Sequence, residues 1–185
     1  MIKDIENNKG NREMGKILET ERLILREFED SDVEALKSVL GDEKVMEFSL
    51  NGAMDEIQIK EFIVKSKARY ENDKTGVWAA ELKSSGKLVG GIGLPFQEVE
   101  GKRYMEVAYR LATKFWGQGL ASEAAKACRD YAFNNLKSNY LISIIEESNT
   151  LSIAVATRIG MKFERNAIAW DIPVKIYSIR NENKQ

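Results

Sequence analysis

The sequence predicts a single α/β domain built around a mixed, mostly antiparallel central sheet flanked by helices. Two observations carry this prediction. The hydrophobic spacing switches between the two-residue period of strands and the 3.6-residue period of helices, and short turns join the strands in the middle of the chain. The 185 residues, 43% hydrophobic and 31% charged, suit one domain with a sizeable core. The expected order is strand, two helices, three strands, helix, strand, helix and two strands, which does not fit a doubly wound parallel sheet.

The N-terminal part is predicted to begin with a tail and a strand. Residues 1–16 are polar and rich in Asn, so we expect a flexible N-terminal tail followed by one domain at 17–185. The apolar run at 22–26, bounded by arginines, predicts the first strand.

Two amphipathic helices are predicted next. The first follows the capping sequence at 30–32 and ends at Gly41. The second begins at Asp55 and Gln58, which have the spacing of a capping box, and continues to Tyr70.

The middle of the chain predicts an antiparallel meander. The apolar runs at 77–82 and 88–94 are joined by a short turn and form a hairpin. A second turn at 100–102 leads to a third strand at 104–111, in which alternate positions are apolar.

The C-terminal part is predicted to alternate helices and strands. Apolar residues at helical spacing predict a helix over 121–132, with Cys128 as a small core residue. A β-branched run at 140–145 predicts a buried strand. The last elements are a helix with Leu151 on its apolar face and Gly160 at its end, and strands at 162–169 and 174–179 around a turn at 171–173.

The composition excludes several classes of function. The chain has no His and a single Cys, so it lacks a Ser-His-Asp triad and a His-ligated metal site, and we expect no metal. A net charge of −1 gives no case for a nucleic-acid or membrane-surface partner. No apolar run approaches the ~18–20 residues needed to span a bilayer, and the N-terminus lacks the apolar region of a secretory signal. One Cys fits a reducing compartment, so we expect a cytoplasmic protein.

The segment at 114–124 carries the clearest chemical signal. Gly117 and Gly119 precede a helix whose first N–H groups are unpaired and partly positive, and Ser122 adds a hydroxyl donor. This combination predicts a phosphate-binding cradle. A flexible turn is the plain alternative. A dinucleotide fingerprint fits poorly, because it requires glycine where Ser122 stands and a parallel unit in place of a meander.

This segment resembles motif A of the GNAT superfamily of N-acyltransferases, in the RimJ/RimL-like branch of ribosomal-protein N-terminal acetyltransferases. Trp116 stands where the superfamily usually has Gln or Arg. The resemblance covers about 17–180 and implies a sheet splayed between its fourth and fifth strands. The matching stretches, in family order, are 20–26, 88–94, 106–111, 114–124 and 149–163.

The resemblance implies an acetyl-CoA-dependent N-acetyltransferase. Acetyl-CoA is the donor substrate, and a primary amine, either a protein N-terminus or a small molecule, accepts the acetyl group directly in a ternary complex. GNAT domains occur as monomers and homodimers. The implied donor-binding residues are Tyr109, Arg110, Leu111, Thr113, Trp116, Gly117, Gln118, Gly119, Leu120, Ala121, Ser122, Asn149 and Ser152.

The implied catalytic residues are Glu106, Ser152 and Asn149. Glu106 would accept the amine proton, which requires burial to raise its pKa or a water relay. Ser152 would protonate the leaving thiolate, and Asn149 would hold the pantetheine arm. Alternatively, Asn149 is only the N-cap of the last helix and Glu106 is an ordinary strand residue.

Other residues are weaker candidates. Glu81 and Glu98 are less favoured as the base. Trp78, Trp116 and Trp170 are expected mostly in the core or in pocket walls, and Met46, Phe48 and Met54 mostly in the core. Two rival functions stay open, a non-catalytic acyl-CoA-binding regulatory module and a nucleotide-dependent oxidoreductase. Either CoA function predicts stabilisation by CoA and not by NAD.

Overall fold

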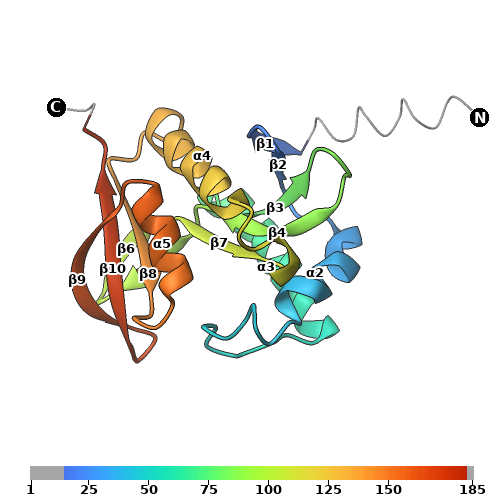
Figure 1. The fold of residues 1–185 in the computed structure, drawn as a ribbon, viewed down its shortest axis with the longest axis horizontal. Helices are drawn as coiled ribbons and strands as arrows, with labels where there is room; N and C mark the ends of the chain where they lie inside the picture. The colour runs from blue at the N-terminus through green and yellow to red at the C-terminus, as the bar shows by residue number, and fades with distance from the viewer. Residues whose placement is uncertain (1–14, 183–185) are drawn as a thin grey trace, which may run out of the picture.

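The computed structural model describes residues 15–182. The predicted tail at 1–16 lies outside this range except for its last two residues, and Lys16 already belongs to a strand. Two sheets stand side by side and a short hairpin covers the smaller one (Figure 1). No helix within 15–182 has the length and apolar character needed to cross a membrane.

The larger sheet has five antiparallel strands in the order β1-β2-β3-β4-β7. Its strand β1 was not predicted, because four half-exposed residues leave no apolar alternation to detect. The predicted hairpin is confirmed as β3 and β4. The strands are β1 Lys16–Glu19, β2 Leu23–Arg26, β3 Val77–Leu82, β4 Leu88–Gly93 and β7 Ala108–Leu111.

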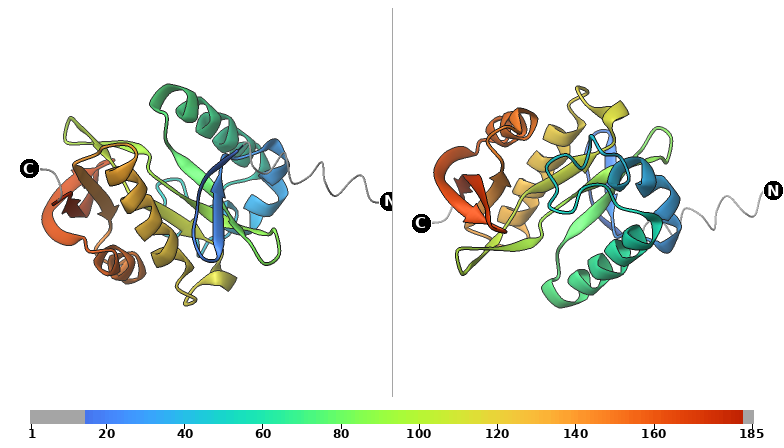
Figure 2. Two further views of the ribbon diagram at one scale, coloured as in Figure 1. Left: turned by 90° about the horizontal axis from the view of Figure 1, so that it is seen from above. Right: turned by 90° about the horizontal axis from the view of Figure 1, so that it is seen from below.

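Helices cover both faces of the larger sheet (Figure 2). The short helix η1 (Asp30–Asp32) leads into α2 (Val33–Leu40), which packs with α3 (Glu56–Asp73) on one face, while α4 (Leu120–Asn134) covers the other. The predicted capping box of α3 is confirmed. The Gln58 N–H donates to Asp55 Oδ1 at 2.8 Å, and the Asp55 N–H donates to Gln58 Oε1 at 2.9 Å.

The smaller sheet has the order β8-β10-β9. Helix α5 (Thr150–Arg158) connects β8 to β9, and the hairpin of β5 and β6 contributes Val99 to a second apolar cluster beneath the sheet. The strands are β5 Phe96–Val99, β6 Lys102–Met105, β8 Tyr140–Ile145, β9 Lys162–Ala169 and β10 Ile172–Arg180.

The two sheets meet where β7 and β8 run parallel, and there they splay apart as predicted. They share one bridge, between Glu106 and Ile142. The Val107 N–H donates to the Ile142 carbonyl at 2.8 Å, and the Ser143 hydroxyl donates to the Val107 carbonyl at 2.8 Å. Beyond this junction the strands diverge, so one edge of β7 pairs with β4 and the other faces the opening (Figure 1).

Glycines in β4 let its neighbours approach closely. A Cβ at Gly90 would collide with the carbonyl oxygen of Arg110 in β7, and a Cβ at Gly93 would collide with the carbonyl oxygen of Gly76. The first contact fixes the backbone of β7 beside the opening.

Two strand predictions were wrong in detail. The strand expected at 104–111 is divided at Glu106 and Val107, because β6 pairs with β5 while β7 pairs with β4. The last hairpin turns at Trp170 and Asp171, with φ of 53° and 63°, which suits a two-residue turn.

Pro173 lies in β10 and not in a turn as expected. It is tolerated because β10 pairs with β8 only from Lys175 onward, so the side of β10 without an N–H has no partner strand there. Leu151 was expected on an apolar helix face but is 62% exposed.

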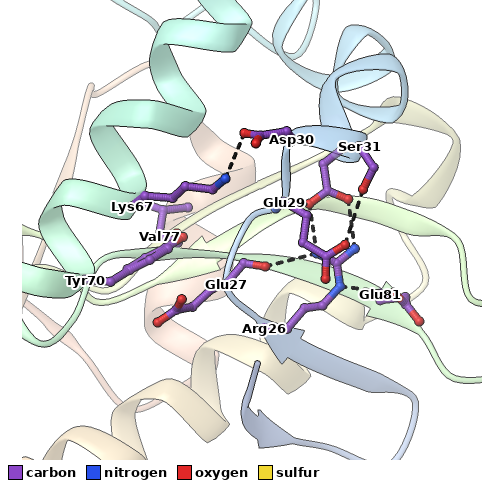
Figure 3. A network of polar contacts seen from close by, with 10 residues as sticks. Arg26, Glu27, Glu29, Asp30, Ser31, Lys67, Tyr70, Val77 and Glu81 are labelled. Carbon is purple, nitrogen blue, oxygen red and sulfur yellow. Dashed lines mark hydrogen bonds and ion pairs between the residues drawn. The ribbon is translucent and has the colours of Figure 1, made fainter. Parts of the chain in front are cut away.

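A buried charge cluster joins the first part of the chain to the sheet (Figure 3). Arg26 donates to both carboxylate oxygens of Asp32 at 2.8 Å and to Glu81 Oε2 at 3.2 Å. The side chains are 12%, 7% and 9% exposed. Hydrogen bonding to Asp32 raises the pKa of Arg26. Glu81, a weaker candidate for the base, therefore serves this cluster.

Candidate active site

The loop that precedes α4 presents a row of unpaired backbone donors. Gly117 and Gly119 have φ of 74° and 78°, conformations that favour glycine, and Gly119 is the N-cap of the helix. From Gly117 to Ser122, no backbone N–H has a hydrogen-bond acceptor among residues 15–182. The Ser122 hydroxyl has no partner within that part of the chain either.

This loop fits an anion such as a diphosphate. Its free N–H groups coincide with the positive end of the α4 dipole, and a Cβ at Gly117 would meet nothing within 4 Å, so that side is open. The loop is thus a turn, as the plain alternative holds, and its free N–H groups also have the arrangement expected of a phosphate cradle.

Three of the residues predicted to bind acetyl-CoA stabilise the loop. The Trp116 indole N–H donates to the Leu111 carbonyl at 2.7 Å, which ties the end of β7 to the loop. Leu120 is 2% exposed and packs in the core, so only its backbone is available. Thr113 begins the short helix η2 (Thr113–Phe115), and its carbonyl accepts from the Trp116 N–H.

Tyr109 bridges the opening between β7 and α5. Its hydroxyl donates to the Ser152 carbonyl at 2.7 Å. Burial raises the pKa of the Tyr109 phenol well above its ordinary value, although hydrogen bonding by the Ser152 side chain opposes this, and the Glu106 carboxylate raises it further. Tyr109 is therefore a neutral hydroxyl at physiological pH. Tyr109 was predicted to bind acetyl-CoA, but this contact of its side chain was not predicted.

Asn149 caps α5, as the alternative reading proposed. Its Oδ1 accepts from the Ser152 N–H at 3.1 Å. The side-chain amide group of Asn149 has no acceptor among residues 15–182, so it stays available to a ligand. The cap places Asn149 and Ser152 together at the end of α5 that Tyr109 reaches.

Glu106 lies at the junction of β7 and β8 and is 8% exposed. Its Oε1 accepts from the Ile144 N–H at 3.3 Å. Burial raises the pKa of Glu106 to about 7, although the Ile144 N–H, the Gln97 side chain and the Arg110 guanidinium all act to lower it. The expected condition for a base, a carboxyl whose pKa burial brings to neutrality, is met.

Arg110 is the cation next to this carboxyl. Burial lowers the pKa of Arg110, and the Glu106 carboxylate acts to raise it. The combination of a titratable carboxyl, a neutral phenol and a serine at one opening can accept and return protons there.

The remaining candidates lie elsewhere. Glu98 is exposed on β5. Cys128 is fully buried, and burial raises the pKa of its thiol, which confirms a core role. Trp78 and Met46 are core residues, whereas Trp170 is 44% exposed. No group of three or more potential metal ligands occurs within 15–182.

A shallow hollow of about 450 Å³ lies on the smaller sheet, away from these groups. It is open to solvent, and none of the predicted site residues lines it. Its walls are Glu100, Glu147, Asn166, Ala167, Ile168, Pro173, Val174 and Lys175.

Arg22 and Glu123, which contact each other next to the glycine loop, were not predicted as site residues. Glu123 lies in the first turn of α4, and Arg22 lies just before β2. Their positions at a helix start and a strand start were visible, but the contact between them was not.

Comparisons with known proteins identify the family. The family model described as an acetyltransferase (GNAT) domain matches residues 22–162. The uncharacterized protein YkkB of Bacillus subtilis (strain 168) is 34% identical over 167 residues, which are 90% of this chain and 96% of that protein.

Solved structures agree as well. A GNAT-family acetyltransferase from Bacillus anthracis has a TM-score of 0.74 and 28% identity, and covers 88% of this chain and 97% of its own. RimL, a ribosomal-protein α-N-acetyltransferase solved with coenzyme A, has a TM-score of 0.75 over 89% of this chain and 97% of its own; its 18% identity shows a common fold. The chain therefore belongs to the GNAT acetyltransferase family, whose members transfer an acyl group from acetyl-CoA.

Proposed function

We propose that this acetyltransferase moves the acetyl group of acetyl-CoA directly to a primary amine in a ternary complex. The observation that carries the proposal is Glu106, a carboxyl with a pKa of about 7 buried at the junction of the splayed strands. A carboxyl of this kind is half deprotonated near neutral pH, where a base is most useful. The absence of His from the sequence agrees with direct transfer, because no side-chain nucleophile needs activation.

Different residues at the opening carry out the separate steps of acetyl transfer. The amine nitrogen forms a bond to the thioester carbonyl carbon, and the carbon–sulfur bond breaks. Glu106 takes the amine proton, directly or through water. A proton from Ser152 returns to the departing thiolate, and the Tyr109 hydroxyl next to it supports that transfer. Backbone N–H groups along β7 polarise the carbonyl.

The donor is proposed to lie from the glycine loop to the end of α5. The diphosphate sits on the N–H groups between Gly117 and Ser122, and the pantetheine arm follows the free edge of β7 toward the amide of Asn149. In this arrangement the glycine loop holds the diphosphate end of acetyl-CoA, and the start of α5 holds the thioester end.

The acceptor is proposed to be a protein N-terminus or a small-molecule amine. The RimJ/RimL-like motifs favour a peptide N-terminus, and RimL, a ribosomal-protein acetyltransferase, shares the fold. A microcin self-immunity acetyltransferase shares the fold at a TM-score of 0.71 and 18% identity, so the fold alone leaves the acceptor class open.

Two measurements test the proposal in sequence. Thermal unfolding with acetyl-CoA, and separately with NAD, tests the donor. A ligand at about 100 times its Kd adds about 2.7 kcal/mol of stability, and we expect this with acetyl-CoA alone. Release of free thiol from acetyl-CoA in the presence of N-terminal peptides or small amines then tests transfer. Stabilisation without thiol release from any amine would indicate a non-catalytic acyl-CoA-binding module and contradict the proposal.

We expect Ser152→Ala to lower kcat by on the order of 10²-fold, the lower end of the range for proton transfer. A thiolate leaves readily without full protonation, which limits the loss. Affinity for CoA, measured by calorimetry, should change little. Ser85→Ala, in the exposed turn between β3 and β4, is the control. A loss confined to affinity would make Ser152 a positioning group.

A further inference from the structure

The turn between β1 and β2 is fastened to the first turn of α4. Glu123 Oε1 accepts from the Thr20 hydroxyl at 2.5 Å and from the Arg22 N–H at 2.8 Å. Glu123 Oε2 accepts from Arg22 Nε at 2.6 Å. Burial raises the pKa of Glu123, but these hydrogen bonds outweigh it and hold the pKa below its ordinary value. Glu123 is thus an ionised carboxylate at the start of the phosphate-binding helix.

The same arginine reaches the glycine loop. Arg22 Nη1 donates to the Gln118 carbonyl at 2.9 Å. Gln118 stands between two glycines, so the peptide units around it have unusual freedom to rotate. A Cβ at Gly119 would lie 3.5 Å from Arg22 Nη2, so the guanidinium covers one side of the loop.

The geometry of the peptide bond gives this contact a consequence. The bond between Gln118 and Gly119 is trans, so its carbonyl and its N–H point in opposite directions. Arg22 holds the carbonyl on its own side. The Gly119 N–H is thereby directed to the other side of the loop, where it has no acceptor among residues 15–182.

We propose that Arg22 is a positioning residue that orients the Gly119 N–H toward the diphosphate of the donor, while its charge balances Glu123. The inference rests on the proposed function, because it concerns the same donor site. Arg22 acts through the loop and does not itself touch the diphosphate. A lysine would keep the charge but lacks the fork that binds Glu123 and Gln118 together.

The test compares donors with and without the diphosphate. Arg22→Gln should raise the KM for acetyl-CoA about tenfold, the loss of one oriented hydrogen bond, and leave kcat near its original value. With S-acetylpantetheine, which lacks the diphosphate, KM and kcat should not change. Arg69→Gln, at an exposed position on α3, is the charge-matched control. It should leave KM and kcat unchanged with both donors. A purely structural role for Arg22 would affect both donors alike and would overturn the proposal.

A double variant separates orientation from charge. Glu123→Gln combined with Arg22→Gln removes the uncompensated carboxylate. We expect the KM for acetyl-CoA to stay raised, whereas recovery to the original value would show that Arg22 only balances charge and would overturn the orientation role. If Arg22→Gln does not fold, Arg22→Lys decides, with a raised KM for acetyl-CoA alone as the expected result.

Direct calorimetry keeps this inference distinct from the proposed function. Failure of the unmodified protein to bind CoA would contradict the proposed function. Binding by the unmodified protein with equal affinity in Arg22→Gln would contradict only the role of Arg22.

Discussion

Glu106→Gln should reduce kcat by about 10²–10⁴-fold while leaving affinity for acetyl-CoA nearly unchanged. The amide keeps the size of the carboxyl and removes its capacity to accept a proton. Steady-state kinetics with saturating donor and acceptor measure the loss. Glu98→Gln, at an exposed position of β5, is the matched control and should retain full activity. Full activity of Glu106→Gln would show that another group is the base.

The pH dependence of kcat/KM is a second test of Glu106 as the base. Because the pKa of Glu106 is about 7, the fraction able to accept a proton rises with pH through that value. We expect kcat/KM of the unmodified enzyme to rise through about pH 7. The residual activity of Glu106→Gln should not show this rise with pH.

Stability should move in the opposite direction to activity. A carboxyl whose pKa is higher in the folded state than in the unfolded state stabilises the fold below the unfolded pKa, and this contribution is lost as the pH rises through the folded pKa. The interval from the ordinary value of 4.5 to about 7 corresponds to roughly 3 kcal/mol. Glu106→Gln should therefore flatten the pH dependence of unfolding and be the more stable protein at pH 8. Equal pH dependence of the two proteins in urea unfolding would contradict this.

Arg26→Met should lower the free energy of unfolding by about 3–5 kcal/mol, the typical cost of removing one partner from a buried ion pair. The substitution fills much of the same space but leaves the Asp32 and Glu81 carboxylates buried without their shared cation. Urea unfolding followed by circular dichroism measures the effect.

An exposed ion pair supplies the control for Arg26. Lys65 and Glu61 pair on α3 at 3.2 Å with side chains 71% and 59% exposed. Lys65→Met should change stability by less than about 1 kcal/mol. Similar losses from the two variants would show that burial is not what makes the Arg26 cluster strong.

Local sequence signals predicted the fold where an element carries its own cap or period. The capping box at Asp55 and Gln58 located the start of α3, and the apolar run of Tyr140–Ile145 located β8. Strands β1, β5 and β6 are short and half-exposed, so they contain too few buried positions to show a period. Each is defined by its pairing with the neighbouring strand of a short hairpin.

The same limit explains the site. The glycine loop was predictable because its residues are adjacent in sequence. The bond from Tyr109 to Ser152 spans 43 positions, the bond from Arg22 to Gln118 spans 96, and the bond from Arg26 to Glu81 spans 55. The hydrophobic period within one helix or strand cannot predict contacts between residues so far apart in the sequence. The pKa of Glu106 likewise depends on its burial against β8.

The bridge between Glu106 and Ile142, which joins the two sheets, also bears on how the protein unfolds. One face of the smaller sheet has an apolar cluster of its own around Ile142 and Ile176, while Leu141 and Ile145 of β8 pack in the main core. Within residues 15–182 the two sheets share one bridge. We expect such a sheet to open as a cooperative unit, with a smaller free energy than the whole protein. Amide hydrogen exchange in β8, β9 and β10 would then be faster than in β3 and β4. The lifetime of the assembled active site is set by the weaker of the two units.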